Sequence, residues 1–195
     1  MKTTGGDMLA EDEFPDYWRF SLAVYGYPEM AQTCLTLQDR VQLDINVLLI
    51  ALFAAGNLGR SITLEEISAG DRQISAWRKE VVEPLRKIRI QLKEGPSPAP
   101  CSDTDSLRSL IKSAELNAEF IEQGVLAKWV QSLPRRTKPE NDIYILTATR
   151  VLDYYASKIN YAADRTDLRR RSQAVAKVAA LPVAALRTGR TNKSE

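Results

Sequence analysis

The residues best suited to chemistry lie in one short stretch, LQDRVQLDINVLLIALFAAG, at residues 37–56. Two acids, Asp39 and Asp44, stand five positions apart, with Gln38 and Asn46 beside them. Carboxylate and amide oxygens of this kind can coordinate a divalent cation or orient a small polar ligand. The stretch therefore raises two hypotheses: a pocket at this corner, or a purely structural role for the same side chains.

The two acids differ in their expected environment. Asp44 directly precedes the apolar run 45–55, where its carboxylate can accept the free N–H groups of a first helical turn. We expect Asp44 to be a structural N-cap. Asp39 falls in the last turn of the preceding predicted helix, where the helix dipole disfavours an acid. If Asp39 is buried, it needs a cation partner. The arginines that could supply one are Arg19, Arg40, Arg78 and Arg86.

A second group of acids could complete a site at this corner. Glu115 and Glu119 are four residues apart, so they share one face of a later predicted helix. The candidate ligand or partner surface consists of Gln38, Asp39, Asn46, Arg78, Arg86, Glu115 and Glu119. Because the sequence carries no cofactor fingerprint and no metal-binding motif, it predicts no cofactor, metal ligand or catalytic residue.

Histidine is absent from the chain. Serine–histidine triads, cysteine–histidine nucleophiles, histidine-ligated zinc sites and the histidine-containing di-iron bundles are therefore excluded. Chemistry on carboxylates, lysine, tyrosine or cysteine stays open, but the sequence favours a non-enzymatic role.

The elements that position these residues are helices. Apolar residues recur at intervals of three and four, whereas the strict alternation of strands is nearly missing. Helices are expected at about 16–25, 28–40 and 44–56, from 102 to the break that begins at Pro134, and around 144–159. Between them, a capping box at Thr63 and Glu66 opens a short helix that ends at Gly70. A long helix follows from Asp71, interrupted by Pro84.

Seven residues of the helix that begins at 102 fall on one apolar face. They are Leu107, Leu110, Ala114, Ala118, Ile121, Val125 and Trp129. The fold class predicted is all-α: a single irregular bundle of about six or seven helices.

We divide the chain into three parts. Residues 1–13 are an acidic, disordered leader, and residues 14–161 form the helical domain. Residues 162–195 are a basic, mostly disordered tail with one helical stretch near 166–180. The proline-rich loop EGPSPAPCSD, at 94–103, separates two groups of helices, each too small for a core of its own, so one domain is expected.

The sequence predicts a cytoplasmic protein. No apolar run reaches the roughly 18 residues of a membrane span, and the acidic leader does not resemble a secretory signal. Cys34 and Cys101 lie far apart without a paired motif, which is typical of a reducing compartment.

Several short blocks resemble a known family. They are Trp18-Arg19-Phe20-Ser21, Leu37-Gln38-Asp39, Asp44-x-Asn46-x-Leu48-Leu49 and Pro84-Leu85-Arg86, with Glu115-Leu116 and Ala118-Glu119 in the later helix. Together they resemble a small conserved proteobacterial family of unknown function, over roughly residues 14–130. The resemblance implies a bacterial helical domain and brings no catalytic residues with it.

Three functions follow from these observations. The first is an accessory or regulatory protein that acts through protein–protein contact, with another protein or with further copies of itself. The second is a small-ligand or divalent-metal-dependent protein with its pocket at 38–46. The third, which is less favoured, is nucleic-acid binding through the basic residues of the long helix and the tail. The net charge of +2 favours neither nucleic acid nor a membrane surface as a partner.

Overall fold

The computed structural model describes residues 14–94, 101–135 and 141–181, and every regular element in these ranges is helical. The elements are α1 (Asp16–Tyr25), α2 (Met30–Val41), α3 (Ile45–Leu58), α4 (Leu64–Trp77), the π-helical turn η2 (Arg78–Val82), α5 (Glu83–Glu94), α6 (Cys101–Gln131), α7 (Ile143–Lys158) and α8 (Thr166–Ala179). Because α4, η2 and α5 are continuous, the described residues form seven helical segments. The predicted all-α bundle is confirmed.

Helix α3 is the central helix of the bundle, as its apolar sequence predicts. Ten of its residues are buried, and α1, α6 and α7 pack around it. Asp44 begins the helix by accepting the Val47 N–H at 3.1 Å, and Gly59 ends it with a φ of 67°. A helix that is apolar on all sides needs neighbours on all sides, so α3 organises the core. Among the described residues, no single helix is long and apolar enough to cross a membrane.

Helix α4 begins with the predicted capping box. The Glu66 N–H bonds to the Thr63 hydroxyl, and the Glu66 carboxylate accepts the Thr63 N–H. The prediction that this helix ends at Gly70 is wrong, because α4 continues to Trp77. Gly70 serves close packing instead: a Cβ at this position would lie 3.1–3.2 Å from three ring atoms of Trp129.

This contact predicts the effect of enlarging Gly70. We expect Gly70→Val to lower the free energy of unfolding by about 2 kcal/mol, because the added methyl groups overlap the Trp129 ring. Urea unfolding followed by circular dichroism measures the change. Ala76→Val, on the exposed side of the same helix, is the control and should cost only about 0.5 kcal/mol of helix propensity. Equal losses in the two variants would contradict the packing role of Gly70.

The long helix accommodates Pro84 by forming a wider, π-helical turn just before it. Proline cannot donate a backbone hydrogen bond, and its ring clashes with the preceding turn of an α-helix. Here the five-residue turn η2 comes directly before Glu83, whose N–H bonds to the Arg78 carbonyl five residues back. The predicted interruption is therefore a π-helical turn, and the helix continues.

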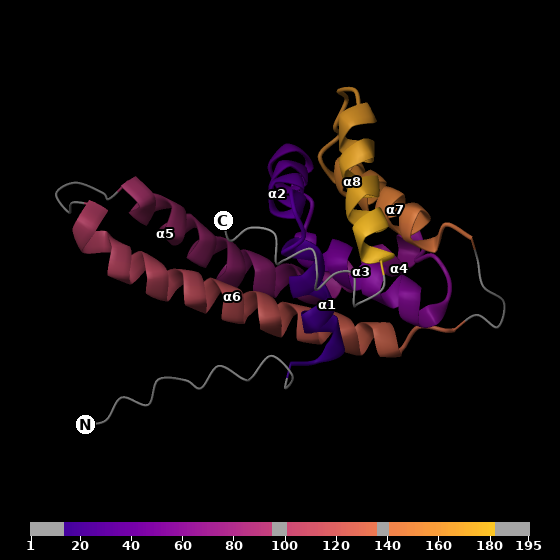
Figure 1. Cartoon of the computed structure of the whole chain (residues 1–195), viewed down its shortest axis with the longest axis horizontal. Coiled ribbons are helices and arrows are strands. Elements are labelled where there is room, and N and C mark those ends of the chain that lie inside the picture. The colour runs from indigo at the N-terminus through magenta and orange to yellow at the C-terminus, as the bar shows by residue number, and fades with distance from the viewer. Residues whose placement is uncertain (1–13, 95–100, 136–140, 182–195) are drawn as a thin grey trace.

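Helices α5 and α6 form a long antiparallel pair. Figure 1 shows α5 along the first half of α6, with both extending away from α3, α4 and α7. Helix α6 begins at Cys101, slightly before the predicted start at Ser102. The remainder of the predicted proline-rich loop, 95–100, lies outside the described residues.

The prediction of a mostly disordered tail after residue 161 is wrong as far as residue 181. The predicted helical stretch is α8, which packs on α7 and α2 (Figure 1). Leu168 and Val175 are fully buried, and the buried Ser172 hydroxyl donates to the Ala148 carbonyl at 2.8 Å. The small alanines of α8 allow close packing, so a thin apolar face is enough to bind the helix to the core. The leader 1–13 and residues 182–195 lie outside the described residues.

Candidate functional site

The structure separates the candidate residues into three groups. Asp44, Asn46 and Arg78 belong to a buried polar network between α3, α4, α6 and α7. Glu115, Glu119 and Arg86 belong to a set of ion pairs between α5 and α6. Gln38 and Asp39 lie on α2 and, within the described chain, take part in neither group.

Asp71 is the centre of the buried network. Only 2% of it is exposed, and its carboxylate accepts four hydrogen bonds. The donors are Arg78 at 2.6 Å, Tyr155 at 2.6 Å, Tyr154 at 2.8 Å and Lys158 at 2.7 Å. Burial by itself would raise the pKa of Asp71, but the bonds from Lys158 and Tyr155 and the charge of Arg78 lower that pKa to about 2. Asp71 is therefore an ionised carboxylate that joins α4 to α7.

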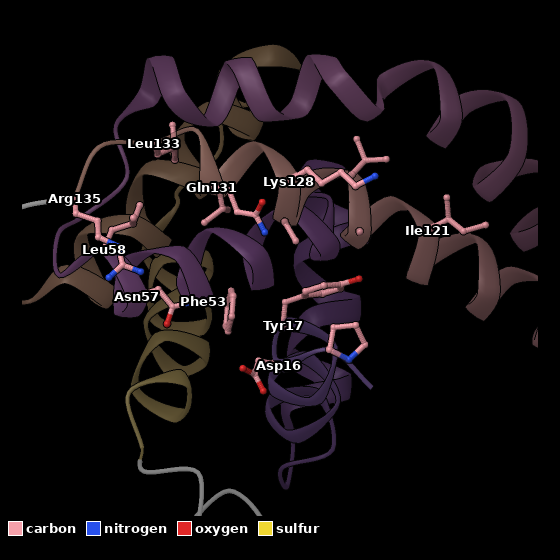
Figure 2. Close-up of a pocket in the computed structure, with 15 residues that line it drawn as sticks. Asp16, Tyr17, Phe53, Asn57, Leu58, Ile121, Lys128, Gln131, Leu133 and Arg135 are labelled. Atoms are coloured by element: carbon pink, nitrogen blue, oxygen red, sulfur yellow. The ribbon is translucent and has the colours of Figure 1, made fainter. Parts of the chain in front are cut away.

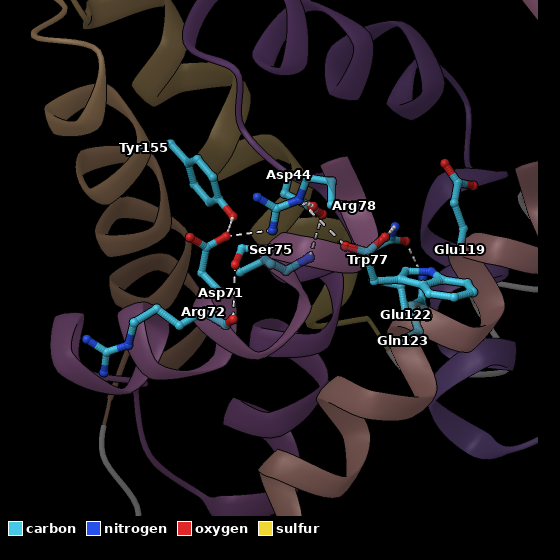
Figure 3. Close-up of polar contacts among 12 residues, drawn as sticks. Asp44, Asp71, Arg72, Ser75, Trp77, Arg78, Glu119, Glu122, Gln123 and Tyr155 are labelled. Carbon is cyan, nitrogen blue, oxygen red and sulfur yellow. Dashed lines mark hydrogen bonds and ion pairs between the residues drawn. The ribbon is translucent and has the colours of Figure 1, made fainter. Parts of the chain in front are cut away.

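Arg78 connects Asp71 to the other side of the network, as Figure 3 shows. Its Nε atom pairs with the Asp44 carboxylate and lies 3.7 Å from Oε1 of Glu122. Asp44 therefore has two roles, since it caps α3 and balances a buried arginine. The Asn46 amide donates to Glu122 at 3.1 Å and accepts from the Gln123 amide at 2.8 Å.

Glu122 is the unusual member of this network. It is fully buried, and burial together with the charge of Asp44 raises its pKa to about 9. The protonated form of Glu122 is therefore favoured in the folded protein. Because the whole arrangement is enclosed by helices, its chemistry stabilises the fold.

The second group fastens α5 to α6. Arg86 bonds to Glu115 at 2.9 Å and to Glu119 at 2.7 Å, and Arg89 forms a further pair with Glu115. Burial would raise the pKa of Glu115, but hydrogen bonds from Arg89 and Arg86 lower it. Both acids are thus occupied by arginines. No three cysteine, aspartate or glutamate side chains in the described part of the chain are placed to hold a metal ion.

The proposed pocket at 38–46 is not assembled by these residues. Asp39 is exposed on α2, so it needs no buried partner, whereas Asn46 is buried and bonds to α6. Gln38 is half-buried. The acids that were to complete the site face the arginines of α5, and Asn46 faces Glu122 and Gln123, so a pocket at 38–46 stays a prediction.

Helix α6 presents an unusual surface, because it buries polar residues and exposes apolar ones. Glu115, Glu122 and Gln123 are buried, while Leu110 is 69% exposed and Ile121 is 50% exposed. We give the name α6 row to four exposed apolar residues and the half-buried Ala114 beside them. The four are Leu107, Leu110, Ile121 and Val125.

Of the seven residues predicted to share one face, only Ala118 and Trp129 are buried. Trp129 packs on Gly70, and the Ala118 carbonyl accepts the Trp77 indole N–H at 3.0 Å. Contacts with α4 therefore set the rotation of α6, and this rotation turns the α6 row away from the bundle.

A groove adjoins the α6 row where α6 meets α1 and α3. Its volume is about 790 Å³. Figure 2 shows Tyr17 and Phe53 pointing into the space beside α6, whose Ile121 and Lys128 lie along one wall. Apolar walls come from Phe53, Leu58, Ile121, Val125 and Leu133, and charges at its margin come from Asp16, Lys128 and Arg135. The groove thus extends the apolar surface of the row to the body of the protein.

Sequence reasoning missed the centre of the buried network and the groove. Asp71 follows a glycine, so it was assigned to a helix cap, although its spacing of seven residues from Arg78 places both on one face of a continuous helix. The adjacent Tyr154 and Tyr155, followed by Lys158, were a further signal of polar contacts from α7. Tyr17 and Phe53 offered no signal, because aromatic residues in helices are mostly part of a core.

Comparison with known proteins gives a family but no activity. No curated protein and no solved structure matches the chain. One family model matches residues 16–126, from α1 to near the end of α6, which is more than half of the chain. The match confirms the resemblance to a conserved family of unknown function. The chain belongs to the family described as "Protein of unknown function (DUF2390)".

Proposed function

We propose that this chain is a small accessory or regulatory protein that acts through protein–protein contact, and that the α6 row and the adjoining groove form its contact surface. The observation that carries the proposal is the exposure of the α6 row, from Leu107 at 49% through Leu110 at 69% to Ile121 at 50%. Monomeric proteins rarely expose a continuous apolar surface, and surfaces of this kind commonly bind other proteins.

The shape and chemistry of the groove support the same role. An apolar groove with charges at its margin is typical of sites that take the apolar face of a partner helix. Asp16 lies at one margin, and Lys128 and Arg135 lie along another, so a bound segment can be oriented by charge.

The two alternatives have less support. The small-ligand or metal hypothesis needs Gln38, Asp39 and Asn46 to share a pocket with Glu115 and Glu119, and these residues lie in three groups. The nucleic-acid hypothesis needs basic residues that can contact phosphates, and several arginines of the long helix and of α8 are paired with acids instead. Arg78 is enclosed by Asp44 and Asp71, and Arg86 and Arg89 are paired with glutamates. On α8, Arg169 and Arg171 lie 3.7 and 2.9 Å from Asp153 and Asp167.

Site-specific photo-crosslinking tests the contact surface. A photoreactive amino acid is introduced at Ile121, in the α6 row, and separately at Gln73, on the exposed side of α4. We expect the Ile121 probe, but not the Gln73 probe, to give a discrete crosslinked protein species in cells of the native host. Val125→Glu should abolish this species, because a carboxylate in the groove opposes apolar contact.

The result decides the proposal in either direction. A discrete species from Ile121 supports it, whether the captured protein is a different one or a second copy of this chain. No species from Ile121, or the same species from both positions, would contradict it. Circular dichroism of the Val125→Glu variant confirms that loss of crosslinking reflects the surface and not the fold.

A further inference from the structure

We infer that the occupant of the α6 row is a second copy of this chain, whose own α6 lies antiparallel along it. This inference rests on the row being a contact surface, as proposed above, and it adds the identity and register of the partner. It follows from the spacing of the exposed residues, from the charges at the two ends of the row, and from the position of the groove.

The exposed face of α6 has the spacing of a coiled coil. Residues 103, 107, 110, 114, 117, 121, 124 and 128 follow one another at alternating intervals of four and three. This seven-residue repeat keeps one seam of a helix facing a partner helix over its whole length. The seam reads Asp103, Leu107, Leu110, Ala114, Asn117, Ile121, Gly124 and Lys128. From Asp103 to Lys128 it is about 38 Å long.

The charges at the ends of this seam select the antiparallel orientation. Asp103 is at one end and Lys128 at the other, and both are exposed. In a parallel pair, aspartate would face aspartate and lysine would face lysine. In an antiparallel pair, each Asp103 faces the Lys128 of the second copy, so two complementary charge pairs close the seam.

The same register matches side-chain sizes along the seam. When Asp103 faces Lys128, Leu110 faces Ile121, and Ala114 faces Asn117. In the same register Leu107 faces Gly124, next to the Tyr17 hydroxyl of the second copy. Asn117 lies near the two-fold axis, where a single polar residue in an apolar seam commonly specifies register at some expense of stability.

The groove completes the arrangement. Its α6 wall includes Ile121, Gly124 and Lys128, which form the second half of the seam. Antiparallel pairing brings the first half of the other α6 to this wall, with Leu107 and Leu110 beside Tyr17 and Phe53 (Figure 2). A Cβ at Gly124 would lie 3.3 Å from the Tyr17 hydroxyl, so α1 approaches α6 closely at this point and forms the side of the groove. Each copy thus supplies a protruding apolar helix and a receiving groove, as a two-fold symmetric interface requires.

Sedimentation analysis of the full-length chain tests the inference through charge reversal. We expect the unmodified chain to be a dimer at micromolar concentration. Asp103→Lys and Lys128→Asp should each raise the dissociation constant about tenfold, because like charges then meet at both ends of the seam. An equimolar mixture of the two variants should form a heterodimer about as stable as the original dimer. In that heterodimer both end pairs are again complementary.

Two further variants complete the test. Leu110→Glu should raise the dissociation constant by more than about 30-fold, and its high exposure means that the monomer stays folded. Lys87→Asp, at an exposed position on α5 outside the seam, is the charge-reversal control and should leave dimerisation unchanged. Circular dichroism is recorded for each variant.

The outcomes separate this inference from the proposed function. The inference is overturned if the chain is monomeric. It is also overturned if neither Leu110→Glu nor the charge reversals change the dissociation constant of the dimer. If such a chain still captures a different protein through the Ile121 probe, the proposed contact surface stands and only its partner is wrong. If the Ile121 probe captures nothing as well, both proposals fail.

Discussion

Asp71→Asn is expected to lower the free energy of unfolding by about 3 kcal/mol, because it removes the charge at the centre of the buried network. Asp71 accepts hydrogen bonds from Arg78, Lys158, Tyr154 and Tyr155. An asparagine keeps the volume of the side chain but supplies one acceptor oxygen in place of two. Asp44 then remains as the nearest anion of Arg78, while Lys158, which is partly exposed, loses its partner.

Urea unfolding at neutral pH measures this loss. Asp39→Asn is the matched control, since it makes the same substitution at an exposed position of α2 and should change stability by less than about 0.5 kcal/mol. The low pKa of Asp71 adds a second signature. Its ionised form is favoured in the folded state, so the stability it contributes is lost as pH falls from about 4 toward 2. A loss in Asp71→Asn no larger than that in Asp39→Asn would show that the network does not hold α4 to α7.

Glu122→Gln is expected to gain stability relative to the unmodified protein as pH rises from about 4.5 to about 9. The pKa of Glu122 is raised to about 9 in the folded state, against an ordinary value of 4.5. The folded state therefore holds a proton that the unfolded state releases, and the stability this proton provides is lost as pH rises through that interval. Glutamine reproduces the protonated acid, because it keeps an acceptor for Asn46 and carries no charge that could oppose Asp44.

Thermal unfolding at about pH 5.5 and about pH 9.5 tests this prediction. At the higher pH the variant should exceed the unmodified protein by about 2 kcal/mol or more, since each unit of pKa shift corresponds to about 1.4 kcal/mol. Glu80→Gln, at an exposed position of η2, is the control and should keep the pH dependence of the unmodified chain. Parallel pH profiles for Glu122→Gln and the unmodified chain would refute the protonated state of Glu122.

The buried network also accounts for the exposure of the α6 row. Glu122 and Gln123 bond to Asn46 of α3, and Glu115 bonds to the arginines of α5. These bonds hold one face of α6 toward the bundle. Leu107, Leu110 and Ile121 lie on another face of the helix, so they are directed outward. The exposure of the α6 row is therefore a consequence of the polar contacts, and partner binding through the row fits a helix whose rotation is already set.

Local sequence determined the elements of this protein. The bounds of α1, the cap at Asp44, the capping box at Thr63 and the apolar character of α3 depend on residues within a few positions of one another, so periodicity and capping rules locate them. The family resemblance also depends on local blocks. The sequence also predicts the helical stretch that forms α8, but it does not predict that α8 packs on the core.

Tertiary structure decided which faces of these helices are buried. Gly70 resembles a helix end until Trp129 packs against it, and Asp71 resembles a cap until α7 brings Tyr155 and Lys158 to it. Asp39, the acid for which the sequence offered no structural role, is exposed on α2. The sequence predicts one buried face that contains the α6 row together with Ala118 and Trp129. In the structure, only Ala118 and Trp129 of these residues are buried. Hydrophobic periodicity identifies an apolar face. Whether that face is buried depends on long-range contacts: residues of α3 and α5 bond to the acids of α6, and residues of α4 contact Trp129 and Ala118.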